Sequence, residues 1–187
     1  IKAHVAEAVS RVDPARYRQE PAYVNAVLGR LDGLVYKGAS GEIEIKSTVV
    51  DDRGPASAES KYGADFAITA VISSGKSKVE KAIIGQAKRG RIEELSAKES
   101  ERLLSQVDKM RRHTDQSVVL EVPELLGSSP RIRLPYLHND GKFKAPVLLE
   151  DYITAQLIAC LHGDRRKNFV DAVQDSTLSR LSLIVRI

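Results

Sequence analysis

The sequence is poor in cysteine and in aromatic residues. Of its 187 residues only Cys160 is a cysteine, none is a tryptophan, and aromatic residues make up 5%. A single cysteine excludes an intramolecular disulfide framework and a cysteine-rich zinc site. The shortage of aromatic rings argues against a protein that binds single-stranded nucleic acid mainly by stacking on its bases.

Long apolar runs are also missing. No stretch approaches the roughly 18 to 20 consecutive apolar residues of a membrane span, and the N-terminal IKAHVAEAVS lacks the pattern of a secretory signal. We therefore expect a cytoplasmic protein. Its 42% hydrophobic and 29% charged residues are typical of one globular domain over 1–187. We divide it into N-terminal helices at 1–38, a core at 40–122, and a C-terminal helix and strand at 148–187.

Positive charge is in slight excess and is clustered. The formal net charge is +4, which suits a polyanionic partner without identifying one. A solvated surface is the commonest reason for such clusters, and those near 76–91 and at 111–112 would hold backbone phosphates if they lay at one site. The clusters are Lys76, Lys78 and Lys81; Lys88, Arg89 and Arg91; Arg111 and Arg112; and Arg165, Arg166 and Lys167.

Hydrophobic periodicity predicts helices and strands in alternation. Apolar residues at helical spacing predict helices in 1–12 and 21–35, and the alternation in GEIEIKSTVVDD predicts a half-buried strand. The segment 52–63 is a polar loop with glycine and proline. The runs ADFAITAVIS and EKAIIGQAK, joined by SGKSK, predict an antiparallel hairpin.

The second half continues this pattern. Ser96 with Glu99 three residues later has capping-box spacing, so we expect a helix over 96–114. A strand, SVVLEVP, follows and would be parallel to an earlier strand because a helix intervenes. A helix ending at Gly163 and a closing strand LSLIVRI complete the chain, and 127–147 remains unassigned. The expected fold is α/β, with a mixed β-sheet flanked by helices.

Polar side chains converge at one end of the predicted hairpin. Gln86 and Lys88 lie two apart on a strand, so they project to one face while Ala87 points the other way. Asp65 opens the preceding strand and would lie opposite them, and Glu59 is six residues earlier in the loop. The hairpin would therefore bring four polar groups to one end of the sheet.

This group of residues suits hydrolysis of a phosphodiester bond. Oxygen ligands from Asp65, Gln86, Glu59 and the backbone carbonyl of Ala87 would hold Mg²⁺ or Mn²⁺, which polarises the phosphate and acidifies the attacking water. Lys88 would orient or deprotonate that water, or stabilise charge developing on the phosphate. The sequence leaves the protonation state of Lys88 open.

These residues resemble a known family. The segments GADF, IIGQAK and QVDKM, within residues 40–122, are similar to the PD-(D/E)xK nuclease superfamily, and most to its Mrr-like branch with a D…QxK active site. The resemblance implies a restriction-endonuclease-like core, catalytic Asp65 and Lys88, a magnesium cofactor, DNA as substrate, and a role in restriction or antiviral defence. It also implies a frequent homodimer, and we consider a separate regulatory or specificity subunit. Gln106 lies where related nucleases can carry a polar helix residue, and an ordinary, partly exposed glutamine is the other interpretation.

The sequence departs from the family pattern at two positions. Gly63 and Ala64 precede Asp65, with no proline, and Gln86 occupies the second acidic position. Loss of one negative charge would weaken metal binding and leaves open whether one ion or two bind. Glu59 would restore the charge or is an ordinary loop carboxylate.

Other functions fit less well. Gly75-Lys76-Ser77 resembles the end of a phosphate-binding loop, but the required earlier glycine is Ala70 and a strand follows. The four histidines lack the paired spacing of zinc ligands. The alternative to an enzyme is a catalytically inactive nuclease-like domain that binds nucleic acid or a protein partner, with contacts mainly from lysine and arginine to phosphate.

Overall fold

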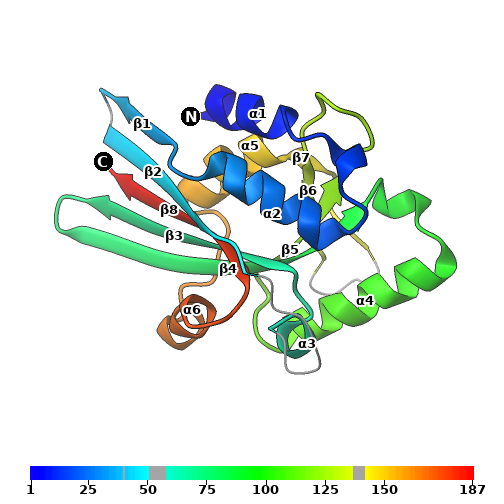
Figure 1. Ribbon diagram of the computed structural model, residues 1–187. Coiled ribbons are helices and arrows are strands. Elements are labelled where there is room, and N and C mark those ends of the chain that lie inside the picture. Colours follow the sequence, from blue (N-terminus) through cyan, green and yellow to red (C-terminus); the bar gives the residue numbers. More distant parts are fainter. Residues whose placement is uncertain (40, 51–57, 137–141) are drawn as a thin grey trace.

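A computed structural model describes residues 1–39, 41–50, 58–136 and 142–187. Within these residues eight strands form one mixed sheet, in the order β1-β2-β8-β3-β4-β5-β6-β7, with helices on both faces (Figure 1). The strands are β1 (Val35–Gly38), β2 (Gly41–Thr48), β3 (Phe66–Ser74), β4 (Ser77–Arg89), β5 (Ser117–Val122), β6 (Arg131–Arg133), β7 (Val147–Leu148) and β8 (Ser179–Arg186). The helices are α1 (Lys2–Ser10), α2 (Glu20–Leu31), α3 (Ala58–Tyr62), α4 (Ala97–Arg111), α5 (Leu149–Asp151) and α6 (Lys167–Gln174), with single turns η1 (Pro14–Arg16) and η2 (Ile92–Glu94) and a π-helical segment η3 (Tyr152–Ile158). The prediction of an α/β fold with a mixed sheet flanked by helices is confirmed.

The predicted hairpin is β3–β4. Its antiparallel register runs from Phe66 opposite Gly85 to Ser74 opposite Ser77, so Gly75 and Lys76 form the connecting turn. Strand follows strand directly, which agrees with the rejection of a phosphate-binding loop there. Strand β5 is parallel to β4, as predicted from the intervening helix.

The sheet separates two hydrophobic cores. One face packs against α1, α2 and the α5–η3 segment, and the other packs against α4 and α6 (Figure 1). Helix α4 begins with the predicted capping box, in which Ser96 and Glu99 bond to each other's backbone. Its apolar stripe, Leu103, Val107 and Met110, belongs to the second core.

The C-terminal strand β8 has an unexpected position in the sheet. It lies between β2 and β3, antiparallel to the first and parallel to the second. The segment 148–187 therefore contributes to the middle of the sheet. Local sequence could not predict this pairing, because more than a hundred residues separate β8 from β3.

Four further segments differ from the prediction, and the first is the helix expected to end at Gly163, which ends at Ile158 with η3. Residues Val35–Gly38 form strand β1, where the N-terminal helices were expected to extend to 38. Helix α3 occupies Ala58–Tyr62 in the predicted polar loop, of which 51–57 lie outside the described residues. Helix α6 was not predicted, because only Phe169, Val170 and Val173 of its eight residues are buried apolar side chains.

The helices carry no membrane span. Within the described ranges, none is both long enough and apolar enough to cross a bilayer.

Candidate functional site

Asp65 joins the two strands of the hairpin at its open end. Its backbone N–H donates to the carbonyl of Gly85 at 2.8 Å, which continues the β3–β4 ladder by one residue. Its Oδ2 accepts the backbone N–H of Ala87 at 2.9 Å and also accepts the side-chain amide of Gln86. The hairpin therefore brings Asp65 into direct contact with Gln86 and Ala87, as the strand pairing predicted.

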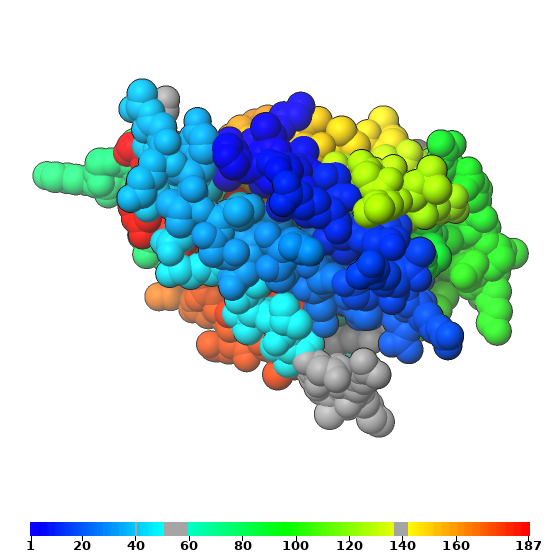
Figure 2. All heavy atoms as spheres, turned by 45° about the horizontal axis from the view of Figure 1, so that its top comes forward, coloured from blue at the N-terminus to red at the C-terminus, as the bar shows by residue number. Residues whose placement is uncertain are grey.

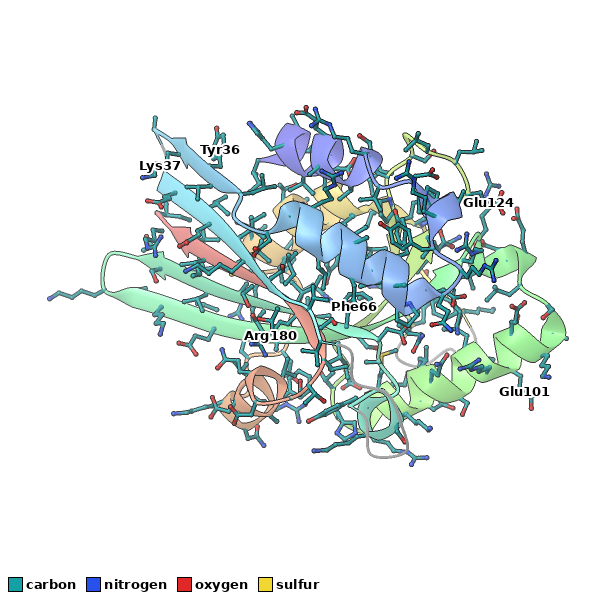
Figure 3. The ribbon with its side chains drawn as sticks, viewed as in Figure 1. Tyr36, Lys37, Phe66, Glu101, Glu124 and Arg180 are labelled. Atoms are coloured by element: carbon teal, nitrogen blue, oxygen red, sulfur yellow. The ribbon has the colours of Figure 1, made fainter. Side chains whose placement is uncertain are left out.

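Close packing of one side chain on the hairpin lies next to this contact. The ring of Phe66, a residue labelled near the centre of Figure 3, lies against Gly85, its register partner on β4. A Cβ added to Gly85 would come within 2.3 Å of the Phe66 ring. A side chain at Gly85 would therefore force the Phe66 ring to move. With glycine there, Asp65 and Gln86 lie side by side at the end of the hairpin.

Lys88 lies on the same face of the sheet as Gln86. In β4, Ile83 and Ala87 belong to the first core, whereas Ile84 belongs to the second. Because side chains alternate along a strand, Gln86 and Lys88 share the second face, toward α4. Lys88 is 8% exposed.

A second observation places Lys88 near the start of α4. The pKa of Glu99 is lowered, mainly by hydrogen bonds from Ser96, and the positive charge of Lys88 adds to the effect. Burial of a lysine ammonium costs free energy unless polar or charged groups compensate for it. Lys88 therefore occupies an interior position between β4 and α4, with acidic groups in range.

The side-chain amide of Gln86 is incompletely bonded. It is 3% exposed; its Nε2 donates to Asp65 and, at 3.2 Å, to the carbonyl of Ala87. Its Oε1 is buried and has no hydrogen-bond partner among the described residues, and the same is true of Oε1 of the buried Gln106 on α4. An unpaired buried carbonyl oxygen costs about 1 to 3 kcal/mol. Two such oxygens on neighbouring elements are suited to accept a hydrogen bond from a ligand or to coordinate a cation.

Gln106 belongs to the same neighbourhood. Gly63, two residues before Asp65, packs so closely on α4 that an added Cβ would lie 2.8 Å from the Gln106 carbonyl oxygen. The side chain of Gln106 is buried, so the interpretation of a partly exposed glutamine is wrong. The sequence signal for this burial was the position of Gln106 next to the apolar stripe of Leu103, Val107 and Met110.

Glu121 is a functional candidate that the sequence reasoning missed. It is 1% exposed and is the β5 register partner of Lys88. Its carboxylate accepts Nε of Arg133 at 3.0 Å and the backbone N–H of Ile92 at 3.0 Å, and it pairs with Nε of Arg131 at 2.9 Å. The only signal was one acidic residue within the apolar strand SVVLEV. Its arginine partners make it a structural ion-pair centre and not an available metal ligand.

The donor atoms fit a hard cation in part. Among the described residues no three His, Cys, Asp or Glu side chains are grouped to hold a metal ion. The oxygens available are the Asp65 carboxylate, the amide oxygen of Gln86 and the carbonyl of Ala87, which are the types that Mg²⁺ and Mn²⁺ accept. Glu59 lies within α3, and its side chain lies outside the described part of the structure.

The basic cluster of Lys76, Lys78 and Lys81 does not lie at this site, so the expectation that it holds phosphates there is wrong. Lys81 is fully buried and donates to the carbonyl of Leu157, so it cannot hold a phosphate. Lys76 and Lys78 lie at the closed tip of the hairpin, roughly 30 Å from Asp65 at about 3.4 Å per residue. The regular spacing of the two strands thus separates residues that are close in sequence.

Comparisons with known proteins do not identify the chain. No protein-family model, curated protein or solved structure matches it.

Proposed function

We propose that the protein is a metal-dependent endonuclease that hydrolyses DNA phosphodiester bonds, in restriction or defence against foreign DNA. The observation that carries the proposal is the direct contact of Asp65 with the Gln86-Ala87 segment, beside a buried Gln86 oxygen with no partner in the described part of the chain. The order of hairpin, helix and parallel strand is also the one that a restriction-endonuclease-like core would have. The insertion of β8 between β2 and β3 is a departure from the simplest version of that core.

The amide of Gln86 explains how a cation would be accepted. In the structure its Nε2 faces Asp65 and satisfies the carboxylate. Rotation of the amide by half a turn exchanges Nε2 and Oε1, and two oxygens would then face each other. That arrangement is unfavourable alone and favourable with a cation between them. A bound Mg²⁺ would polarise a phosphate oxygen and lower the pKa of a bound water.

Lys88 would act on the phosphate or on the water. Its ammonium is held in the interior on the face that Gln86 shares, where water competes weakly for it. There it would stabilise negative charge that develops on the phosphate, or position the attacking water by a hydrogen bond. Asp65 would hold the cation and, through the Ala87 N–H, keep the two strands in register.

The test compares cleavage of plasmid DNA in Mg²⁺ by the parent protein and three variants. Asp65→Asn keeps the size of the side chain and an acceptor for the Ala87 N–H while it removes the charge. We expect Asp65→Asn and Lys88→Ala to lose at least about a hundredfold in rate, since each removes a group that acts in the transition state. Lys76→Ala removes the same charge from the exposed tip of the hairpin and should cleave like the parent. Equal cleavage by all four proteins would contradict the catalytic assignment.

The non-catalytic alternative predicts a different result in the same assay. A domain that only binds nucleic acid would retain DNA in a gel-shift assay in Ca²⁺ and release no product in Mg²⁺ or Mn²⁺. Its binding would weaken steeply with salt, because contacts would be to phosphates. Retention without product would support this alternative over the endonuclease.

A further inference from the structure

The loop between β5 and β6 holds two leucines in solvent. Leu125 is 71% exposed and Leu126 is 62% exposed. The backbone N–H of Ser128 donates to the Leu125 carbonyl at 3.3 Å, and that of Gly127 donates to the Ser10 carbonyl at the end of α1 at 3.2 Å. These bonds fasten the turn to the body of the protein. The two leucines are therefore an apolar projection on an anchored turn.

A cavity of about 450 Å³ lies beside Leu125. Leu125 is on its wall, together with Arg91 beyond the end of β4, Glu121 of β5 and Arg131 of β6. Glu121 is the register partner of Lys88, and Arg91 is three residues beyond Lys88. Because neighbouring strands lie about 4.8 Å apart, the wall of the cavity at Glu121 is next to Lys88. It thus adjoins the candidate site at the carboxyl ends of two parallel strands.

The charges of the cavity are nearly balanced. Two guanidinium groups face three carboxylates, and they are paired: Arg131 with Glu121 at 2.9 Å, and Arg91 with Glu94 at 3.7 Å. The third carboxylate is that of Glu124, labelled at the edge of the molecule in Figure 3. A phosphate would gain little from this balanced set. Adjacent donors and acceptors beside apolar walls suit a neutral polar heterocycle, and a nucleobase edge has this chemistry.

We infer that the β5–β6 loop unstacks DNA and that the cavity receives the displaced base. Leu125 and Leu126 would enter the base stack as an apolar wedge, a use of leucine known in DNA-bending proteins. The base would then contact the paired arginine and glutamate groups and the apolar wall. Figure 2 shows the loop, in yellow-green, on the surface between the blue N-terminal helices and the green segment near residue 100, where a duplex could reach it. This inference rests on the proposed function, because it requires DNA at Asp65 and Lys88.

The test uses 2-aminopurine, a base whose fluorescence rises when it leaves the stack. A short duplex that the parent protein binds is prepared with this base at each position in turn, and Ca²⁺ replaces Mg²⁺ so that DNA is bound and kept intact. We expect a several-fold rise in fluorescence at one or two adjacent positions. The double variant Leu125→Ala, Leu126→Ala should lower that rise to the level of free duplex. Leu161→Ala is the matched control, since Leu161 is also 71% exposed and lies on the wall of neither this cavity nor the candidate site.

The outcomes separate this inference from the proposed function. If the parent binds and cleaves DNA but no position brightens, the base-extrusion inference is wrong and the endonuclease remains. The inference is also overturned if the double variant brightens the duplex as the parent does, and the leucines would then face a protein partner. If the parent neither binds nor cleaves DNA, the proposed function fails first and this inference fails with it. Equal thermal unfolding of parent and double variant excludes misfolding, because both leucines are exposed.

Discussion

At the scale of single residues, the amide of Gln86 can donate a hydrogen bond to Asp65 and can also offer an oxygen to a cation. A carboxylate could do only the second. Without a cation the amide donates to Asp65 and to the Ala87 carbonyl, so the end of the hairpin is held together. A glutamate at this position would place two carboxylates in contact, which raises the pKa of one of them or separates the strands. The neutral glutamine therefore allows the site to remain assembled before any metal binds.

Substitution Gln86→Glu tests this interpretation. We expect its free energy of unfolding at neutral pH to fall by about 1 to 3 kcal/mol without metal, because a hydrogen bond is replaced by repulsion between like charges. Mn²⁺ should then raise its melting temperature more than it raises that of the parent, since binding to the native state stabilises it. Calorimetric melting with and without Mn²⁺ measures both effects.

Gln86→Met is the control for this experiment, because it removes the hydrogen bond without adding charge. It should lose stability and gain nothing from Mn²⁺. If Mn²⁺ shifts the two variants equally, the ion does not bind beside residue 86.

At the scale of elements, the packing of a β3 side chain on β4 depends on one glycine. The Phe66 ring occupies the space that a side chain at Gly85 would need. Gly85→Ala should therefore displace the Phe66 ring and, with it, the start of β3 and the neighbouring Asp65. We expect a loss of about 1 to 3 kcal/mol in unfolding free energy, the usual cost of overpacking, and a parallel loss of DNA cleavage.

A double-mutant cycle with Phe66→Leu checks this explanation. The smaller side chain leaves room for the new methyl group, so the double variant should be less destabilised than the sum of the two single variants. Urea denaturation gives the three values. Strict additivity would show that the ring and the glycine are not coupled.

The elements that sequence predicted are those defined by local signals. Alternation and a Gly-Lys turn specified the β3–β4 hairpin, and Ser96 with Glu99 specified the start of α4. Contact of Asp65 with Gln86 followed from the hairpin alone. Long-range features were not predictable in this way: nothing near β8 indicates that it pairs between β2 and β3, and nothing near Glu121 indicates that Arg131 and Arg133 will neutralise it. The site is thus locally encoded, whereas its surroundings depend on the assembled sheet.

At the scale of the whole molecule, the C-terminal third completes both the sheet and its cover. Strand β8 fills the gap between β2 and β3, and the backbone of Asp164 exchanges two hydrogen bonds of 2.9 Å with Ala82 of β4. Two residues before Asp164, His162 forms a hydrogen bond through Nδ1 with the hydroxyl of the buried Tyr152 at 2.6 Å. The histidine therefore connects the cover of the first core to the segment that closes on β4.

This half-buried histidine makes the stability of the fold depend on pH. Burial, with smaller contributions from the positive charges of Lys144 and Lys81, lowers the pKa of His162 to about 4 from its ordinary 6.5. The unfolded chain therefore takes up a proton below about pH 6.5 that the folded protein does not accept until about pH 4. Unfolding becomes easier as the pH falls between these values, and the effect ends below pH 4. Because the ring is partly exposed, we expect a loss on the order of 2 kcal/mol.

Urea denaturation of the parent and of His162→Asn at several pH values between 7 and 4 measures this contribution. The variant has no titrating group at this position, so the difference in unfolding free energy between the two proteins should shrink steadily as the pH falls. Other groups that titrate in this range cancel in that difference, because both proteins contain them. A difference that stays constant from pH 7 to pH 4 would mean that His162 is protonated as easily in the folded protein as in the unfolded chain. The closure of the C-terminal segment on β4 would then not depend on a neutral imidazole.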